Sequence, residues 1–208
     1  NLPNALNVSV LYVLPDAIAA AKAFEECLQL GAKAALLKAR EEMLLYSVAQ
    51  SNESLYERLK AFGDAITGKA DLIITTPDAL IQKAPEPEWF YNLLLRFKTG
   101  KEYKLENIIK SLIVSGYKRE NLINARAQFA LRGDILDIYP INCEVPVRME
   151  FFGDELESIK YFSLENYKTN KAVQEISVYP ATDVFYENAE DIITALSAYK
   201  GRQEKTDN

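Results

Sequence analysis

Three arginines lie in or next to expected short β-strands: Arg119, Arg132 and Arg148. Arg119 follows a Gly-Tyr pair that is typical of a helix end. Arg132 comes just before a Gly-Asp turn, and Arg148 lies inside a β-prone run. A guanidinium group is planar, permanently charged and able to donate several hydrogen bonds, so it suits carboxylates on a partner. These arginines are therefore candidate docking residues.

Each arginine also has an acidic neighbour, namely Glu120, Asp134 or Glu150. Ion pairs on a protein surface are common and contribute little to stability or function. Taken alone, the residues favour this structural pairing over a docking role.

The sequence contains little that indicates a phosphate-binding, catalytic or metal site. Residues 63–70 nearly spell the phosphate-binding pattern GxxxxGK[ST], but Ala70 has no hydroxyl group for Mg²⁺. The pattern also requires a strand before the loop and a helix after it, whereas here a helix precedes and a strand follows. We interpret Gly68 as a helix end. Histidine is absent, which removes the commonest general base and metal ligand. We expect no catalytic, cofactor or metal site.

The composition is that of a folded protein, with 208 residues, 49% hydrophobic and 26% charged, enough for one domain or two small ones. A net charge of −6 argues against a dedicated nucleic-acid binder. Cys27 and Cys143 form no CxxC pattern, which suits a reducing cytosol, and no membrane span or signal peptide is visible. We expect a cytoplasmic location. Because the chain begins with Asn1, we expect it to be part of something longer.

The first 85 residues alternate strand and helix patterns. Strands are expected at 8–14, 34–37 and 71–76, and helices at 17–30, 52–66 and 78–82. Asp16 is a suitable N-cap for the first helix, whose apolar face is expected to be Ala17, Ala21, Phe24 and Leu28. The second helix is expected to bury Leu55, Leu59, Phe62 and Ile66. This order predicts a parallel sheet with right-handed crossovers.

A proline-rich break at residues 84–87 indicates a domain boundary. An entry strand at 93–98 and an amphipathic helix at 105–115 follow it. Four β-runs come next, with turns at Gly133 and Gly153 and a loop at 140–146. In the third run, Val145, Val147, Met149 and Phe151 are expected on one face, with Arg148 and Glu150 on the other. We predict an exit strand at 173–179, a last helix at 188–199 and a disordered tail at 200–208.

Three blocks, at residues 116–119, 129–140 and 148–157, resemble the UvrB-homology region. That region is shared by the excision-repair protein UvrB and the N-terminal part of the transcription-repair coupling factors (Mfd). The resemblance implies a small β domain that docks UvrA, with Arg119, Arg132 and Arg148 as the contact residues. With the resemblance in view, docking becomes the favoured role of these arginines. UvrB carries a further arginine where this chain has Ala130, so details of the contact can differ.

Residues 45–47, 55–59 and 72–80 resemble the matching segment of the coupling factors less sharply. In UvrB this interval holds a tyrosine-rich hairpin that inserts into DNA, and here the interval is too short for one. The resemblance therefore favours the coupling factors over UvrB.

The resemblance implies an α/β fold in two parts. Residues 1–85 and 175–208 would form a parallel-sheet, helicase-like domain with a degenerate P-loop NTPase architecture. Residues 86–174 would be an inserted α+β, mainly antiparallel, UvrA-interaction domain. The implied function is a non-catalytic module that recruits UvrA in transcription-coupled nucleotide excision repair.

The implied parent protein is an ATP-driven DNA translocase that acts on RNA polymerase and DNA. Its ATP and Mg²⁺ would be bound by a motor outside these residues, and this part alone would bind DNA little or not at all. Two alternatives stay open: a truncated UvrB-like or helicase-like ATP-dependent DNA-binding enzyme fragment, and a structural domain that masks the motor.

Overall fold

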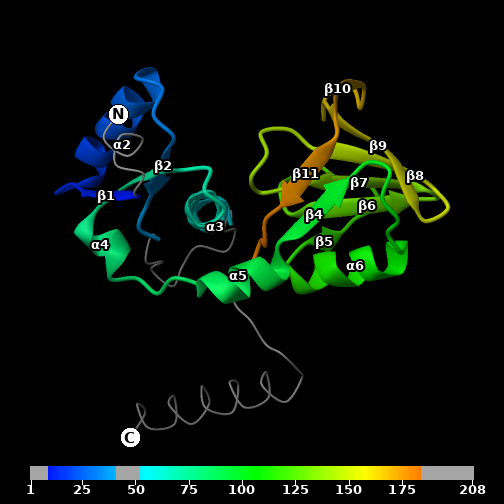
Figure 1. The fold of residues 1–208 in the computed structure, drawn as a ribbon, viewed down its shortest axis with the longest axis horizontal. Helices are drawn as coiled ribbons and strands as arrows, with labels where there is room; N and C mark the ends of the chain where they lie inside the picture. The colour runs from blue at the N-terminus through cyan, green and yellow to red at the C-terminus, as the bar shows by residue number, and fades with distance from the viewer. Residues whose placement is uncertain (1–8, 41–51, 184–208) are drawn as a thin grey trace, which may run out of the picture.

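The computed structural model describes residues 9–40 and 52–183, and Figure 1 shows their arrangement. Three short apolar strands form a parallel sheet in the order β1 (Val10–Val13), β3 (Leu72–Thr75) and β2 (Ala34–Leu37). The helices α2 (Ala17–Gln29) and α3 (Glu53–Ile66) connect these strands and pack on the sheet. The two crossovers run in opposite directions, so right-handed connections place α2 and α3 on opposite faces. The predicted parallel sheet is confirmed.

The start of α2 is the one expected. Asp16 is extended, and its carboxylate accepts a hydrogen bond from the Ala19 N–H at 2.8 Å. The predicted apolar face is wrong, because Ala17 and Leu28 are exposed and the inward residue is Ala20. Small and apolar residues surround this helix on most sides, so periodicity alone could not fix its rotation.

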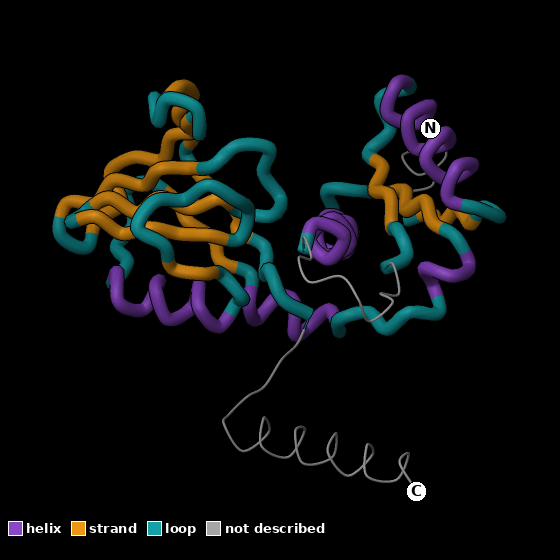
Figure 2. Tube along the Cα trace, turned by 180° about the vertical axis from the view of Figure 1, so that it is seen from behind, coloured by secondary structure: helices purple, strands orange, loops and turns teal. Residues whose placement is uncertain are grey.

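Two short helices lead from the first sheet into the second part of the chain. They are α4 (Pro77–Leu80) and α5 (Pro87–Leu93), and each has a proline in its first turn. Figure 2 shows α4, α5 and the following α6 (Leu105–Val114) along one side of the molecule. The proline-rich stretch was expected to be only a boundary, and α5 was not predicted.

The second part is built on a six-stranded sheet in the order β10-β9-β8-β7-β6-β5. Its members are β5 (Lys118–Arg119), β6 (Gln128–Arg132), β7 (Ile135–Tyr139), β8 (Val147–Phe152), β9 (Glu155–Phe162) and β10 (Thr169–Val173). All neighbours are antiparallel except β5 and β6. Gly133 and Gly153 have φ of +59° and +61°, a conformation that glycine adopts without strain, so both predicted hairpin turns are confirmed.

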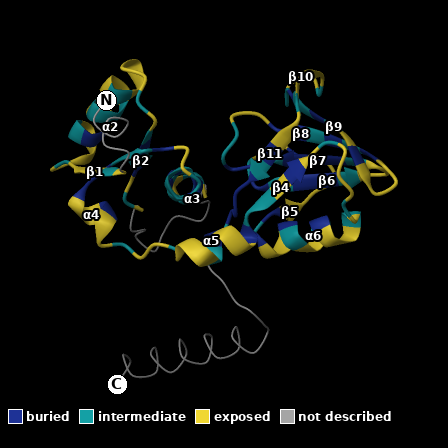
Figure 3. Cartoon of the chain, in the orientation of Figure 1, coloured by how far each residue is buried: buried dark blue, intermediate teal, exposed yellow. Residues whose placement is uncertain are grey.

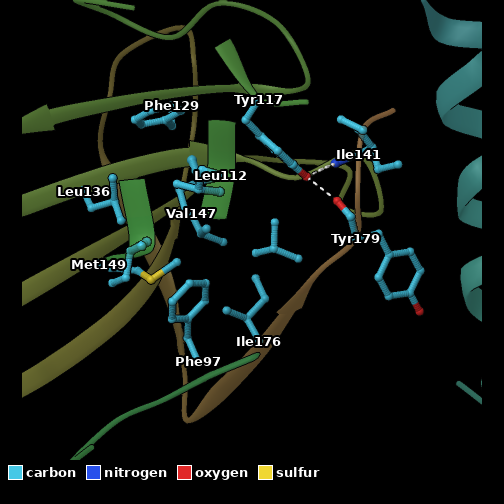
Figure 4. Close-up of a cluster of buried hydrophobic side chains, with 14 of the residues drawn as sticks. Phe97, Leu112, Tyr117, Phe129, Leu136, Ile141, Val147, Met149, Ile176 and Tyr179 are labelled. Atoms are coloured by element: carbon cyan, nitrogen blue, oxygen red, sulfur yellow. Dashed lines mark hydrogen bonds between the residues drawn. The ribbon is translucent and has the colours of Figure 1, made fainter. Parts of the chain in front are cut away.

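The expected entry and exit strands pair with each other. β4 (Leu95–Lys98) and β11 (Glu175–Val178) form an antiparallel ribbon that packs against the core of the six-stranded sheet through Phe97 and Ile176. Buried residues gather between this ribbon, α6 and β6–β8 (Figure 3). Figure 4 shows the Tyr117 hydroxyl in this core. It donates to the Tyr179 carbonyl at 2.8 Å and accepts from the Ile141 N–H at 3.3 Å.

The same core extends into α3. Tyr56 and Leu59 belong to it together with Phe90 and Tyr179, while Ala61 packs on the other side with Ala35 and Leu37 of β2. The single apolar face predicted for this helix was therefore incomplete. The division at residues 85 and 174 remains a prediction, and the expected features at 188–199 and 200–208 lie outside the described residues.

The protein is thus α/β, with a parallel sheet and a small, mainly antiparallel domain. Residues 63–70 join the end of α3 to β3, with Gly68 at φ +72°, so the order needed for a phosphate loop is reversed, as expected. Within the described ranges, no helix is both long and apolar enough to span a membrane.

Candidate docking surface

The strand alternation of β8 separates core from surface. Val147, Met149 and Phe151 are buried, while Arg148 and Glu150 lie on the opposite face, as predicted. Val145 does not belong to the buried row, because it precedes the strand and is exposed. The sheet thus presents alternate residues of β6, β7 and β8 on a face turned away from the main core.

Asp137 organises this face. It lies in the middle of β7, directly opposite Ala130 of β6 and Arg148 of β8, and only 1% of its side chain is exposed. Arg148 donates to both of its oxygens, from Nε at 2.7 Å and from an Nη at 2.8 Å. Arg132 lies two residues along β6 from Ala130 and donates to the same carboxylate. One buried carboxylate therefore binds two guanidinium groups.

Arg148 is held by two kinds of contact. Besides the bidentate contact, its guanidinium carbon lies 4.9 Å from the centre of the Phe162 ring, a cation–π arrangement. The hydrogen bonds to Asp137 raise the pKa of Arg148 above its ordinary value. Its side chain is 17% exposed, whereas that of Arg132 is 45% exposed. Arg132 therefore has the greater reach toward a partner, and Arg148 has the more fixed geometry.

A second polar cluster adjoins this pair. The Glu150 carboxylate accepts hydrogen bonds from Ser158 and Lys160 of β9, both at 2.6 Å. The Lys160 and Ser158 contacts lower the pKa of Glu150 below its ordinary value, since they favour the ionised carboxylate. The face is thus a ladder of alternating charges on rigid strands.

The three predicted arginines are not brought together. Arg119 lies in β5 beside Phe129, a core-facing residue of β6, so its register position alternates with that of Arg132. It is exposed, and no ion pair links it to another described residue. The structure joins Arg132 with Arg148 and leaves Arg119 at the edge of the sheet.

Sequence reasoning missed two residues of this face. Asp137 was not considered as the arginine partner, although an aspartate between Leu136 and Ile138 in a strand signals a buried charge that needs a counter-ion. Phe152 follows Glu150 on the same face at the end of β8 and is 76% exposed, although a large aromatic side chain is usually sheltered. We define the docking face as Arg132, Arg148 and Phe152.

Comparison with known proteins shows what this domain is similar to. Residues 95–184 match the family described as the UvrB interaction domain. The transcription-repair-coupling factor of Staphylococcus aureus (strain USA300) is 29% identical over 163 residues, which are 76% of this chain and 14% of that protein. UvrABC system protein B of Dehalococcoides mccartyi (strain CBDB1) is 29% identical over 165 residues, 79% of this chain and 25% of that protein. The chain spans 14% to 25% of the length of these curated relatives. Over residues 95–184, this chain is similar to the UvrB interaction domain family.

Proposed function

We propose that this chain is a non-catalytic interaction module of a bacterial transcription-repair coupling factor and that it recruits UvrA for nucleotide excision repair. The observation that carries the proposal is the pair of arginines held on Asp137. They lie on the face of the six-stranded sheet that is turned away from the main core, within the family's matched range. We place its work in the cytoplasm. RNA polymerase, DNA, ATP and Mg²⁺ belong, in this proposal, to other parts of the parent protein.

The docking face suits a protein partner. Its arginines are held by Asp137 before binding, so little side-chain entropy is lost when a partner arrives. Arg132 offers exposed N–H donors to an acidic group, and Phe152 offers an exposed aromatic anchor at the end of β8 on the same face. Arginine and aromatic residues are the side chains that most often dominate binding energy at interfaces. Arg119 would contact UvrA separately, from the exposed edge strand β5, because its register with core-facing Phe129 turns it away from the docking face.

We further propose that the parallel sheet is a degenerate, helicase-like NTPase sheet. In open α/β sheets, ligands bind beyond the carboxyl ends of the strands. In this chain Arg58 of α3 lies near those ends, almost fully buried. It donates to the carbonyls of Lys38 at 2.8 Å, just after β2, and Ala79 at 3.0 Å in α4. An arginine that joins β2 to α4 in this way supports a structural role for this end of the sheet.

The alternative, a truncated ATP-dependent enzyme, depends on the loop at residues 63–70. Lys69 would have to reach phosphates, but its Nζ lies 4.9 Å from the Tyr179 ring centre. If the chain were such an enzyme, ATP would bind it measurably and Lys69→Ala would abolish the binding. We expect that neither the parent chain nor the Lys69→Ala variant binds ATP.

The docking proposal is tested by calorimetric titration of UvrA. We expect Arg132→Ala to weaken binding by about 2 kcal/mol or more if its contact is desolvated. Phe152→Ala should weaken it comparably, as expected of an aromatic anchor. Arg148→Lys keeps the positive charge but cannot form the bidentate hydrogen bonds to Asp137. This variant therefore tests whether the geometry of Arg148 matters for UvrA binding.

The matched control is Arg96→Ala, an exposed arginine of the same domain on the ribbon β4–β11. It removes an equal charge away from the docking face and should leave UvrA affinity unchanged. Each variant must first melt like the parent chain. If folded Arg132→Ala and Phe152→Ala bind UvrA with parental affinity, the docking face is wrongly assigned.

A further inference from the structure

A basic groove lies against the ribbon β4–β11. Its volume is about 800 Å³, and it is lined by the ribbon, the loop after β7, β9 and the segment after α3. Four basic and two acidic residues contribute to its walls: Lys69, Arg96, Lys98, Lys101, Glu102 and Glu175. In a chain of net charge −6, this groove is a local concentration of positive charge.

Three of these cations form no ion pair with a described residue. Lys69 instead places its ammonium group 4.9 Å from the centre of the Tyr179 ring. Lys98 pairs with Glu175 at 3.9 Å across the ribbon. Arg96 and Lys101 have no ion pair with any residue in the described ranges, and both are exposed. Exposed guanidinium and ammonium groups that converge on one groove attract an acidic ligand over several ångströms.

A free strand edge of β4 adjoins the groove, and Arg96 lines both. The Thr99 N–H donates to the carbonyl of Gln174, the residue just before β11. The Lys98 N–H points away from β11 and donates to the Tyr103 hydroxyl at 2.9 Å. The alternation of an antiparallel pair turns the N–H and C=O of Arg96 to the same outer edge. A second cavity of about 510 Å³ runs between this edge and α6. An extended chain can therefore hydrogen-bond to β4 there.

This groove is distinct from the docking face. Phe97 and Ile176 of the ribbon pack into the core together with Val147 and Met149 of β8, whereas Arg148 points to the other side of that strand. The ribbon and the docking face therefore lie on opposite sides of the six-stranded sheet. A partner in the groove would leave the docking face open.

We propose that the groove binds an extended, acidic segment of a second protein, which adds along β4 and places carboxylates against Arg96 and Lys101. A nucleic-acid strand fits less well. Its phosphates carry a charge at every nucleotide, and Glu102 and Glu175 would oppose them. An acidic peptide can space its charges to avoid those two residues. The proposal is independent of UvrA recruitment.

The test is fluorescence anisotropy with the 208-residue chain. The probe is a labelled peptide of about twelve residues that alternates glutamate and threonine, as β-strand addition requires. A peptide with glutamine in place of glutamate and a single-stranded oligo-dT of similar length are the comparison probes. The double variant Arg96→Gln/Lys101→Gln should bind the acidic peptide about tenfold more weakly, the loss expected when two attractive charges are removed.

The matched control is Lys22→Gln/Lys171→Gln, which removes the same charge from exposed sites on α2 and β10. It should change the affinity less than about twofold, and Arg132→Ala should not change it. In hydrogen exchange, the Arg96 amide should become protected when the acidic peptide binds.

Three results would overturn the proposal: equal binding of the glutamine peptide, an equal loss in the control variant, or no protection of the Arg96 amide. Tighter binding of oligo-dT, lost in Arg96→Gln/Lys101→Gln, would assign the groove to nucleic acid instead. A loss of UvrA binding in the docking-face variants has no bearing on any of these outcomes.

Discussion

Asp137 determines how the arginines beside it respond to substitution. Its carboxylate is almost fully buried and satisfied by two guanidinium groups, so removing one of them is not equivalent to removing the other. Arg148 supplies two of the hydrogen bonds from a sheltered position, while Arg132 supplies one from an exposed position. A loss of partner binding can therefore arise from a changed fold as easily as from a lost contact.

We expect Arg148→Ala to lower the free energy of unfolding by about 3 kcal/mol, the scale seen when one partner of a buried ion pair is removed. Arg132→Ala should lower it by less than about 1 kcal/mol, because its half-exposed pair is screened by water. Urea unfolding of both variants measures the difference. Equal destabilisation by the two substitutions would contradict this division of roles.

Glu150 makes the stability of the six-stranded sheet depend on pH. Hydrogen bonds from Lys160 and Ser158 hold its pKa below the ordinary value of 4.5, so folding favours the ionised carboxylate. The resulting stability is fully present above pH 4.5 and is lost as the pH falls through the lower pKa of the folded state. The change in stability that Glu150 causes therefore occurs only at acid pH.

Glu150→Gln removes the titrating group and keeps its size. The parent should be more stable than this variant at neutral pH, and the gap should shrink as the pH falls below 4.5. Thermal melting of both proteins across that range measures it. Asp154→Asn, at the exposed hairpin turn, serves as the control carboxylate. A gap that does not change between neutral and acid pH would show that Glu150 is not coupled to folding in this way.

Among the secondary-structure elements, α3 has the most demanding position. Tyr56 and Leu59 enter the core of the six-stranded sheet, and Ala61 packs on the parallel sheet. Tyr179 is fixed against its last turn, with hydroxyl contacts of 3.0 Å to Thr67 and to Asp64. A helix buried on two sides leaves little free volume, and Gly63 is where the packing is closest.

We expect Gly63→Ala to destabilise the protein by about 1–3 kcal/mol through overpacking, although alanine normally favours a helix over glycine. A Cβ at Gly63 would lie 2.4 Å from the Tyr179 ring and 2.6 Å from Phe90. Ser54→Ala, at an exposed position of α3, is the control and should change stability by less than about 0.5 kcal/mol. Chemical denaturation decides the matter, and a stabilised Gly63→Ala variant would refute the packing argument.

Local chemistry predicted the features that depend on a few neighbouring residues. Asp16 as an N-cap and the Gly133 and Gly153 turns follow from rules that act within four residues. The partner of Arg148 could not be predicted in this way, because Asp137 meets it only through the register of two strands. The same limit applies to α3, since its second buried side depends on a sheet more than sixty residues away in the chain.

At the scale of the whole molecule, the two sheets have unequal cores. The parallel sheet shares a small cluster that contains Ala35, Leu37, Ala61 and Ala70, while the six-stranded sheet has a far larger one. Alanines bury little apolar surface, so the hydrophobic stabilisation of the first sheet is modest. The first sheet should therefore depend on α3, which is anchored in the larger core.

This dependence predicts that the two parts unfold together. Trp89 in α5 is the only tryptophan of the chain and packs against the large core, whereas the far-ultraviolet signal also includes α2, outside that core. Urea unfolding followed by both probes should give coincident transitions, the behaviour of a single cooperative unit. Leu59→Ala removes a fully buried side chain of α3 and should destabilise the protein by about 2–5 kcal/mol. It should move both transitions by the same amount, because α3 carries the coupling. If the far-ultraviolet transition instead separates from the Trp89 transition in the parent chain, the parallel sheet is an independent unit and the shared helix does not couple the two.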